Sequence, residues 1–268
     1  MPERRDMGKK IRRILMIVLL LIFLGSVASI LLALYQYQKN DRLYAEGAAN
    51  YTRIQTAAPT ETGPAGEEEK VLAPIVVDFA GLSAVNEDVT GWIYCEGTKI
   101  DYPVLQGADN DFYLHHNYIR ESSSAASIFV DANNRSGFAD ANTIIYGHHM
   151  RDGSMFAGLD EWAKQEYYED HPVMWLLTPE QDYRIDLFAG YTTSADADTY
   201  MIFHENDEAF LSYLDSCAKQ SDFTSEILPD GDGRYVVLST CAYVFDNARY
   251  VLHGKLVPVD SAGGAELP

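Results

Sequence analysis

The stretch YVVLSTCAYVFDNARYVLHGKLV, residues 235–257, decides the fold. Its two ends are rich in β-branched and aromatic residues, and polar, turn-forming residues separate them. Two such runs joined by a turn predict an antiparallel hairpin, in which the strand that opens at Arg249 pairs with the strand that ends at Cys241. We therefore expect a thiol and a guanidinium group to lie side by side where the hairpin closes.

Short runs of the same composition recur through the rest of the chain, separated by turn signals. With the hairpin they make eight candidate strands: Gly91–Tyr94, Ile100–Leu105, Ser127–Val130, Thr143–Tyr146, Met174–Leu177, Tyr183–Tyr191, Tyr235–Ser239 and Tyr250–Val257. We expect a mainly β fold, in which a mainly antiparallel sheet closes into a barrel. The spacing of apolar residues predicts helices at Met155–Tyr168 and Asn206–Lys219, and a short helix is expected at Asp78–Leu82.

The segment from Ile14 to Tyr35 holds 22 residues without a charge. As a helix it would rise about 33 Å, close to the thickness of a bilayer core. A cleaved signal peptide is the alternative, but the run is longer than the usual core of about 7–15 residues and lacks a clear A-x-A cleavage pattern. We expect an uncleaved anchor that crosses the membrane once. Basic residues before it and an acidic chain after it predict a cytoplasmic N-terminus and an extracellular C-terminal part.

These observations divide the sequence into four regions. They are a basic cytoplasmic tail at 1–13, a transmembrane anchor at 14–35, an extracellular stalk or linker at 36–70 and a folded catalytic domain at 71–268. The linker assignment depends on the stretch AAPTETGPAGEEEK, which is rich in Pro, Gly, Thr and Glu. The chain is 47% hydrophobic and 12% aromatic, which is too apolar for a disordered protein, so the last region is expected to have a packed core.

The charge of the chain argues against one class of partner. The net charge is −20 at pH 7, and residues 1–39 carry seven Lys or Arg against two acids, so the remainder is still more acidic. Such a surface repels phosphate backbones, and nucleic acid binding is therefore disfavoured. No metal or other cofactor is expected, because the acids that cluster after residue 195 match no calcium loop: Asp196, Asp198, Glu205, Asp207 and Glu208.

The three cysteines, Cys95, Cys217 and Cys241, form neither a CxxC pair nor a zinc-ligand pattern. A lone cysteine in a strand is most often a buried packing residue. Cys241 differs because it stands at the end of a strand, where a rigid element would hold a nucleophile in place. Arg249 could stabilise the thiolate and hold the oxygens of an acyl substrate. Its alternative is a surface side chain lying over the sheet.

A thiol nucleophile also needs an acid that protonates the leaving amine, and histidine supplies one near neutral pH. Of the seven histidines, His148 and His149 directly follow a strand end, in the run TIIYGHHM (143–150). Gly147 lets the backbone approach its neighbours closely, so the next side chain can turn into a cleft. This pair therefore contains the candidate acid.

These residues carry a family resemblance. The strand end LSTC (238–241), the downstream Arg249 and the strand end YGHHM (146–150) together resemble a sortase of class B. The segment NEDVTGWIYCEGTKIDYPVLQGADNDFYL (86–114) resembles the first strands of that family. The resemblance covers about residues 78–257 and includes the ordered set of His, Cys and Arg.

The resemblance implies an eight-stranded β-barrel with added helices, and it implies a reaction. Sortases cut the C-terminal sorting signal of a secreted protein after Thr, hold it as a thioester and pass it to an amine, usually on a cell-wall peptide. Here Cys241 would attack, and Arg249 would steady the oxyanion. His148 would transfer protons, and it is preferred to His149 because the catalytic His of the family directly follows the glycine. Flanking residues that could orient this trio or bind the signal peptide are Tyr146, Ser239 and Thr240.

Two other interpretations of the function stay open. A surface cysteine protease would use the same trio to hydrolyse its substrate, and a catalytically idle protein of this fold would bind or scaffold. The expected partners are secreted proteins that bear a sorting signal, an amine acceptor such as a peptidoglycan precursor peptide, and the membrane through the N-terminal helix. The sequence of the sorting signal depends on the shape of a groove, which residue patterns do not give.

Overall fold

The computed structural model describes residues 3–55, 71–242 and 246–260. The chain divides between Leu43 and Tyr44 into an N-terminal helical unit and a compact C-terminal unit. Helix α1 (Glu3–Tyr51) forms the first unit as far as Leu43, and its last turns belong to the second unit.

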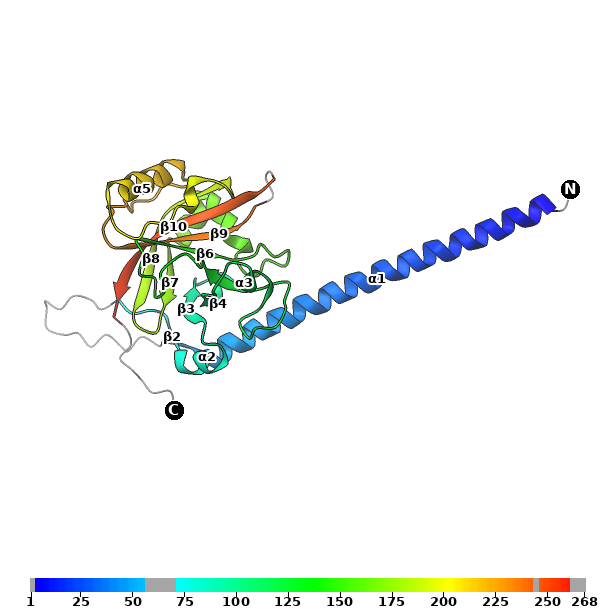
Figure 1. Ribbon diagram of the computed structural model, residues 1–268, viewed down its shortest axis with the longest axis horizontal. Helices are drawn as coiled ribbons and strands as arrows, with labels where there is room; N and C mark the ends of the chain where they lie inside the picture. Colours follow the sequence, from blue (N-terminus) through cyan, green and yellow to red (C-terminus); the bar gives the residue numbers. More distant parts are fainter. Residues whose placement is uncertain (1–2, 56–70, 243–245, 261–268) are drawn as a thin grey trace. The chain divides into compact units, whose positions relative to one another are not determined.

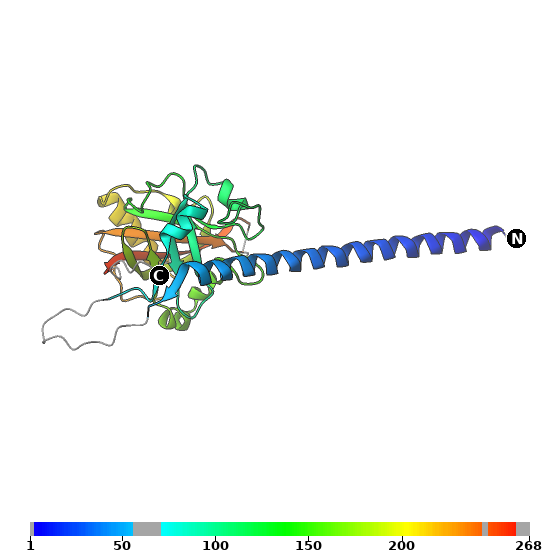
Figure 2. The same ribbon diagram turned by 90° about the horizontal axis from the view of Figure 1, so that it is seen from below.

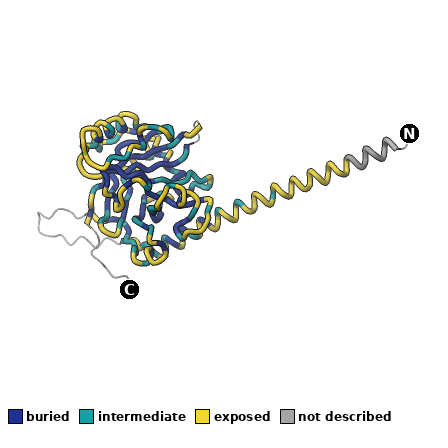
Figure 3. Tube along the Cα trace, in the orientation of Figure 1, coloured by how far each residue is buried: buried dark blue, intermediate teal, exposed yellow. Residues whose placement is uncertain are grey.

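The N-terminal unit is a continuous helix whose middle is apolar. The large apolar side chains between Ile14 and Tyr35 are exposed, as the yellow stretch of the tube in Figure 3 shows. Among the described residues this is the one helix long and apolar enough to cross a membrane, with a mean hydropathy of 3.0 in its most apolar window. It is therefore a candidate membrane anchor, because exposed apolar side chains over this length are stable in lipid and not in water.

The C-terminal unit is built on a closed barrel of eight strands in the order β10-β8-β7-β3-β4-β5-β6-β9. The prediction of a mainly β, mainly antiparallel barrel is confirmed, since only the β4–β5 and β6–β9 pairs are parallel. The strands are β3 (Val89–Tyr94), β4 (Asp101–Leu105), β5 (Ile128–Val130), β6 (Asn142–Tyr146), β7 (Val173–Leu177), β8 (Asp182–Ser194), β9 (Arg234–Cys241) and β10 (Ala248–Val259).

The remaining elements lie outside the barrel wall. Strand β1 (Thr52–Ile54) pairs with β2 (Ile75–Val77) in a separate two-stranded sheet. The helices are α2 (Phe79–Val85), α3 (Phe112–His115), η1 (Ala157–Ala163), α4 (Gln165–Asp170), η2 (Asp198–Tyr200) and α5 (Glu208–Gln220). Figure 2 shows β9 and β10 side by side as the orange and red strands of the wall.

Two segments differ from the sequence-based expectations. The helix expected at Met155–Tyr168 is broken into η1 and α4, because Lys164 between them is extended, with φ −99° and ψ 124°. Residues 44–54, expected in the stalk, join the compact unit. They do so because β1 pairs with β2, and the Asp78 backbone N–H donates a 2.8 Å hydrogen bond to the Tyr51 carbonyl.

Helix α5 packs on the outer face of the barrel over β8, β9 and β10 (Figure 1). Its N-cap is Asp207, whose side chain accepts a 2.8 Å hydrogen bond from the Phe210 backbone N–H. The predicted apolar face, Phe210, Leu214 and Cys217, is buried against the wall. On β9, alternate residues starting at Tyr235 face this helix, and those between them line the barrel interior.

A histidine of β10 is buried in the layer under α5. His253 is 1% exposed and stacks on Tyr191, with ring centroids 5.3 Å apart. Burial lowers the pKa of His253 to about 3, because an apolar site disfavours the charged imidazolium. In the unfolded chain the same group titrates near its ordinary value of 6.5. The unfolded state therefore binds one more proton than the folded state between these two values.

This linkage predicts an acid-sensitive fold. As pH falls from 6.5 towards 3, His253 should remove about 1.4 kcal/mol of unfolding free energy per pH unit. Replacement of His253 by Phe should remove this contribution to the slope of unfolding free energy against pH. Urea unfolding of the full-length protein in detergent between pH 4.5 and 7.5 measures that slope. His115→Gln, at an exposed histidine, is the control that should keep the wild-type slope. Equal slopes for wild type and His253→Phe would contradict the assignment.

Candidate active site

The site is built around β9, which lies between β6 and β10 in the barrel wall. In the antiparallel β9–β10 pair, Cys241 is registered with Arg249, as predicted from the sequence. In the parallel β6–β9 pair, Tyr146 is registered with Ser239, and the Gly147 N–H donates a 3.0 Å hydrogen bond to the Ser239 carbonyl. Two residues further along the parallel strands, the chain from β6 reaches the level of Cys241 at His148.

The side chains of this trio share the outer face of the barrel. Cys241 has the same strand parity as Tyr235 and Val237, which pack under α5, so its thiol projects to that face. Cys241, Arg249 and His148 are all partly exposed, whereas the residues on either side of Cys241 and of Arg249 are buried. The barrel thus presents a thiol, a guanidinium group and an imidazole together at the surface.

The imidazole of His148 is held by the backbone of α3. Its Nε2 lies 2.9 Å from the Leu114 carbonyl oxygen. Because a carbonyl only accepts hydrogen bonds, Nε2 carries the proton in this contact and Nδ1 is left to exchange protons. Gly147 makes the approach possible: a Cβ there would lie 2.5 Å from Ile128 and 2.6 Å from Phe156, so a larger residue would displace the turn.

Next to Cys241 the same face carries two stacked tyrosines. Tyr200 shares a 2.8 Å hydrogen bond with the Ser239 hydroxyl, and its ring lies 6.3 Å from that of Tyr146. Tyr146 in turn donates a 2.9 Å hydrogen bond to Asp131. Burial is the main cause that raises the pKa of Tyr200, while the charge of Arg249 lowers it and that of Cys241 raises it. Tyr200 therefore lies within electrostatic reach of both groups and stays a neutral phenol.

Comparison with known proteins decides the family. Residues 93–257 match the model of the Sortase domain. Sortase B of Listeria monocytogenes is 38% identical over 91% of this chain and 95% of its own length. The chain belongs to the sortase family, in class B.

Sortase B of Bacillus anthracis superimposes with a TM-score of 0.69 at 29% identity, over 84% of this chain and 99% of that one. The substrate complex of Staphylococcus aureus sortase B does so with a TM-score of 0.64 at 33% identity, over 68% and 85%. The protein is therefore a cysteine transpeptidase with the sortase barrel.

Not every residue expected in the site of this sortase reaches the same face. Tyr146 and Ser239 lie on the face of Cys241, but Thr240 has the opposite strand parity. Thr240 is 2% exposed, and its hydroxyl has no hydrogen-bond partner among the described residues. It lines the barrel interior. Tyr200 was not anticipated from the sequence, because it ends the short η2 turn between β8 and α5, where no periodic pattern exists.

The segment after Tyr200 is fixed by a buried carboxylate. Asp140, with a fully buried side chain, accepts a 2.7 Å hydrogen bond from His204 and a 2.8 Å bond from Asn134. Burial raises the pKa of Asp140, but bonds from Asn134, His204 and Arg135 outweigh it and lower the pKa to about 2. The Asn142 side chain adds bonds of 2.9 and 2.7 Å to the backbone of residues 201 and 203. These contacts hold the chain that carries Tyr200 against β6.

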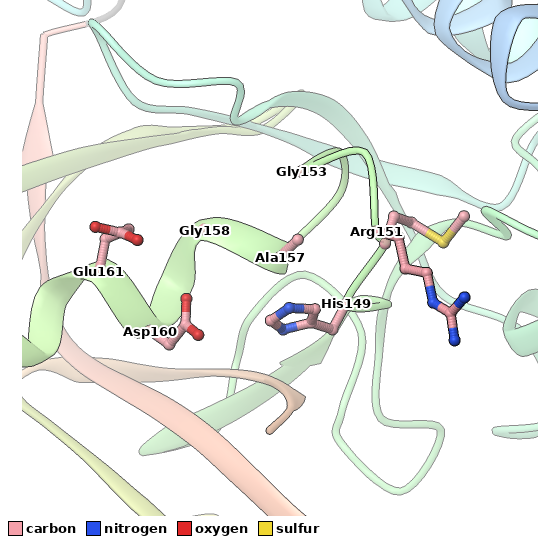
Figure 4. Close-up of a pocket in the computed structure, with 8 residues that line it drawn as sticks. His149, Arg151, Gly153, Ala157, Gly158, Asp160 and Glu161 are labelled. Atoms are coloured by element: carbon pink, nitrogen blue, oxygen red, sulfur yellow. The ribbon is translucent and has the colours of Figure 1, made fainter. Parts of the chain in front are cut away.

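A hollow opens on the other side of the histidine pair, over the turn from β6 to η1. Figure 4 shows its lining, with the ring of His149 directed towards Asp160 of η1. His149 forms an isolated bridge with Met155, and the Phe156 N–H donates a 3.0 Å hydrogen bond to the His148 carbonyl. Within the described residues, no three His, Cys, Asp or Glu side chains are arranged to bind a metal ion.

The Tyr200–Ser239 bond should couple η2 to β9. We expect Tyr200→Phe and Ser239→Ala each to lower the free energy of unfolding by about 1 kcal/mol, because each removes one partner of a half-buried hydrogen bond. The double variant should lose less unfolding free energy than the two single variants together, by about 0.5–1.5 kcal/mol. Urea unfolding of the wild type, the two single variants and the double variant gives the four free energies of this double-mutant cycle. Strict additivity would show that the two hydroxyl groups do not interact.

Proposed function

We propose that this protein is a membrane-anchored sortase that cleaves a C-terminal sorting signal after Thr and transfers the acyl group from Cys241 to an amine, which attaches surface proteins to the cell wall. The observation that carries the proposal is the register of β9, which pairs Cys241 with Arg249 on one side and brings His148 level with it on the other. Membership of the sortase family supports a sorting-signal substrate, and the Staphylococcus aureus relative has been solved as a substrate complex.

In the first half-reaction the thiolate of Cys241 attacks the Thr carbonyl carbon. A C–S bond forms, the scissile C–N bond breaks, and the protonated His148 gives its proton to the departing amine. Arg249 donates hydrogen bonds to the oxygen that becomes negative in the tetrahedral intermediate. Nδ1 of His148 is the nitrogen suited to this proton transfer, since Nε2 donates to the Leu114 carbonyl.

In the second half-reaction an amine attacks the thioester carbon. The new C–N bond forms, the C–S bond breaks, and Cys241 leaves as a thiolate while the amine nitrogen gives its proton to His148. The enzyme returns to its starting state, and ping-pong kinetics follow. Tyr146 and Tyr200 form the wall along which the signal peptide lies, because they continue the face of Cys241, and the buried Ser239 holds Tyr200 by its hydrogen bond.

The N-terminal helix holds this chemistry at the membrane. We infer that residues 1–13 are a cytoplasmic tail, that residues 14–35 cross the bilayer, and that the C-terminal unit is extracellular. The supporting observation is the excess of Lys and Arg before the apolar run. The amine acceptor is then a component of the wall that lies outside the membrane, such as a peptidoglycan precursor peptide.

Acyl transfer and plain hydrolysis are separated by one experiment. The full-length protein in detergent is incubated with a panel of fluorogenic sorting-signal peptides, with and without triglycine or hydroxylamine as amine. We expect cleavage of at least one peptide, a thioester on Cys241 in the mass spectrum and a ligated product when amine is present. Cys241→Ala should show none of these. Hydrolysis that no amine changes would favour a cysteine protease, and the absence of cleavage and thioester would favour an idle binding protein.

Arg249 should act through its geometry as well as its charge. Arg249→Lys keeps the positive charge but loses the planar fork of donors, so kcat should fall about 10²–10³-fold, as expected for the loss of an oxyanion donor. Arg184→Lys, which alters an arginine paired with Asp186 on β8, is the control and should retain activity. Full activity of Arg249→Lys would assign this residue to charge steering alone.

A further inference from the structure

A polar cluster beside α3 is built around Asn86, which is 3% exposed and lies at the C-cap of α2. Its side-chain amide donates hydrogen bonds of 2.9 Å to the Tyr113 hydroxyl and 2.8 Å to the Tyr118 carbonyl. Its oxygen accepts bonds of 3.0 Å from the Arg120 guanidinium group and 3.1 Å from the Asp88 backbone N–H. Both hydrogens and both lone pairs of the amide are used, so the arrangement is well defined.

A charged pair completes this set of residues, which we call the Asn86 cluster: Asn86, Asp88, Tyr113 and Arg120. Asp88 accepts a 2.6 Å hydrogen bond from the Tyr113 hydroxyl and pairs with Arg120 at 2.9 Å. Burial, with the bond to Asp88, raises the pKa of Tyr113 to about 12, so the phenol keeps the proton that it donates. Arg120 has a left-handed backbone with φ 62°, which few side chains adopt, and this turn directs its guanidinium group back to the cluster.

Tyr113 fastens α3 to the barrel. Of the four residues in this helix it is the buried one, at 0% exposed, whereas Phe112 and Leu114 are 38% and 37% exposed. The helix lies outside the strand ladder of the barrel, and its backbone bonds to the loop before β5, where the Ser127 N–H donates to the Tyr113 carbonyl. Since Asp88 directly precedes β3, the Asn86 cluster connects this helix to the start of a barrel strand.

The fastening reaches the active site within one residue. The Leu114 carbonyl follows Tyr113 in the chain and accepts the hydrogen bond from Nε2 of His148 at 2.9 Å. A shift of the carbonyl by about 0.7 Å would take this contact beyond hydrogen-bond range. The imidazole could then turn, and Nδ1 would no longer be held in place for proton transfer. The position of α3 therefore decides whether His148 is aligned.

We propose that the Asn86 cluster positions His148 for proton transfer, by fixing the Leu114 carbonyl through Tyr113. This inference rests on the proposed function. The residues of the cluster act through His148 and are therefore positioning residues. Their effect falls on the step in which the C–S bond forms, the scissile C–N bond breaks and the proton of His148 passes to the departing amine nitrogen. A slightly misplaced proton donor slows this step, because proton transfer requires hydrogen-bond distance.

Two substrates separate positioning from general damage to the fold. One is a sorting-signal peptide that the wild type cleaves at its amide bond, and the other is the same acyl peptide as a 4-nitrophenyl ester, whose leaving group departs without a proton. With the full-length protein in detergent, rapid-quench mass spectrometry measures the rate at which the thioester forms on Cys241. Tyr113→Phe should lower the amide rate about tenfold and the ester rate less than twofold, because only the amide needs the proton of His148.

Three further variants frame this result. Tyr168→Phe is the matched control, since it removes the hydroxyl of another buried tyrosine, which shares a 2.8 Å hydrogen bond with Ser225, and it should leave both rates within twofold. His148→Gln should show the same selective loss of the amide rate, but a larger one. Arg120→Gln changes a half-exposed side chain at the edge of the cluster and should lower the amide rate about twofold to fivefold with the ester rate unchanged.

The outcomes distinguish this inference from the proposed function. If Tyr113→Phe slows the amide and the ester equally, or slows neither, while the wild type forms its thioester, the positioning role is overturned alone. An equal loss on both substrates in Arg120→Gln would overturn it as well. A wild-type protein that forms no thioester from any sorting-signal peptide would overturn the proposed function and this inference together.

Discussion

The site depends on one strand having two neighbours of opposite direction. Strand β9 runs parallel to β6 and antiparallel to β10, and both partners reach its C-terminal end. The parallel pairing brings the loop after β6 to Cys241, and the antiparallel pairing brings the start of β10 to it. Because ladder hydrogen bonds fix the register of all three strands, the nucleophile, the imidazole and the guanidinium group are positioned by backbone pairing. A slip of one residue on β9 would turn Cys241 into the barrel.

The rest of the unit stabilises that arrangement from two sides. Inside the barrel, alternate residues of β9 are fully buried and hold the strand in place. Outside it, α5 covers the N-terminal half of β9, and the last residue of the strand, Cys241, is partly exposed. The buried Asp140 then ties the segment after Tyr200 to β6. The reactive residues lie at the end of β9 that α5 does not cover, so the rigid core and the accessible site occur on the same strand.

Much of this was predictable because it depends on local pattern. Runs of β-branched and aromatic residues between turn signals predicted the strands, and the hairpin predicted that Arg249 lies next to Cys241. The alternation of side chains along a strand would also have excluded Thr240 from the face of Cys241. The place of Tyr200 in the site could not be predicted from the sequence, because its position depends on contacts with Ser239 and with the segment held by Asp140, which are distant in sequence. The pairing of β1 with β2 was missed for the same reason: two short runs on either side of the linker carry no signal of their partner.

The three cysteines differ sharply in their surroundings. Burial raises the pKa of Cys95 to about 12 and also raises the pKa of Cys217, and both side chains are almost completely shielded from solvent. Only Cys241 is partly exposed. A maleimide or another soft electrophile will therefore modify the folded protein at a single position, although the chain contains three thiols. Labelling stoichiometry then counts competent enzyme molecules directly, and occupancy by an acyl group can be followed as protection from alkylation.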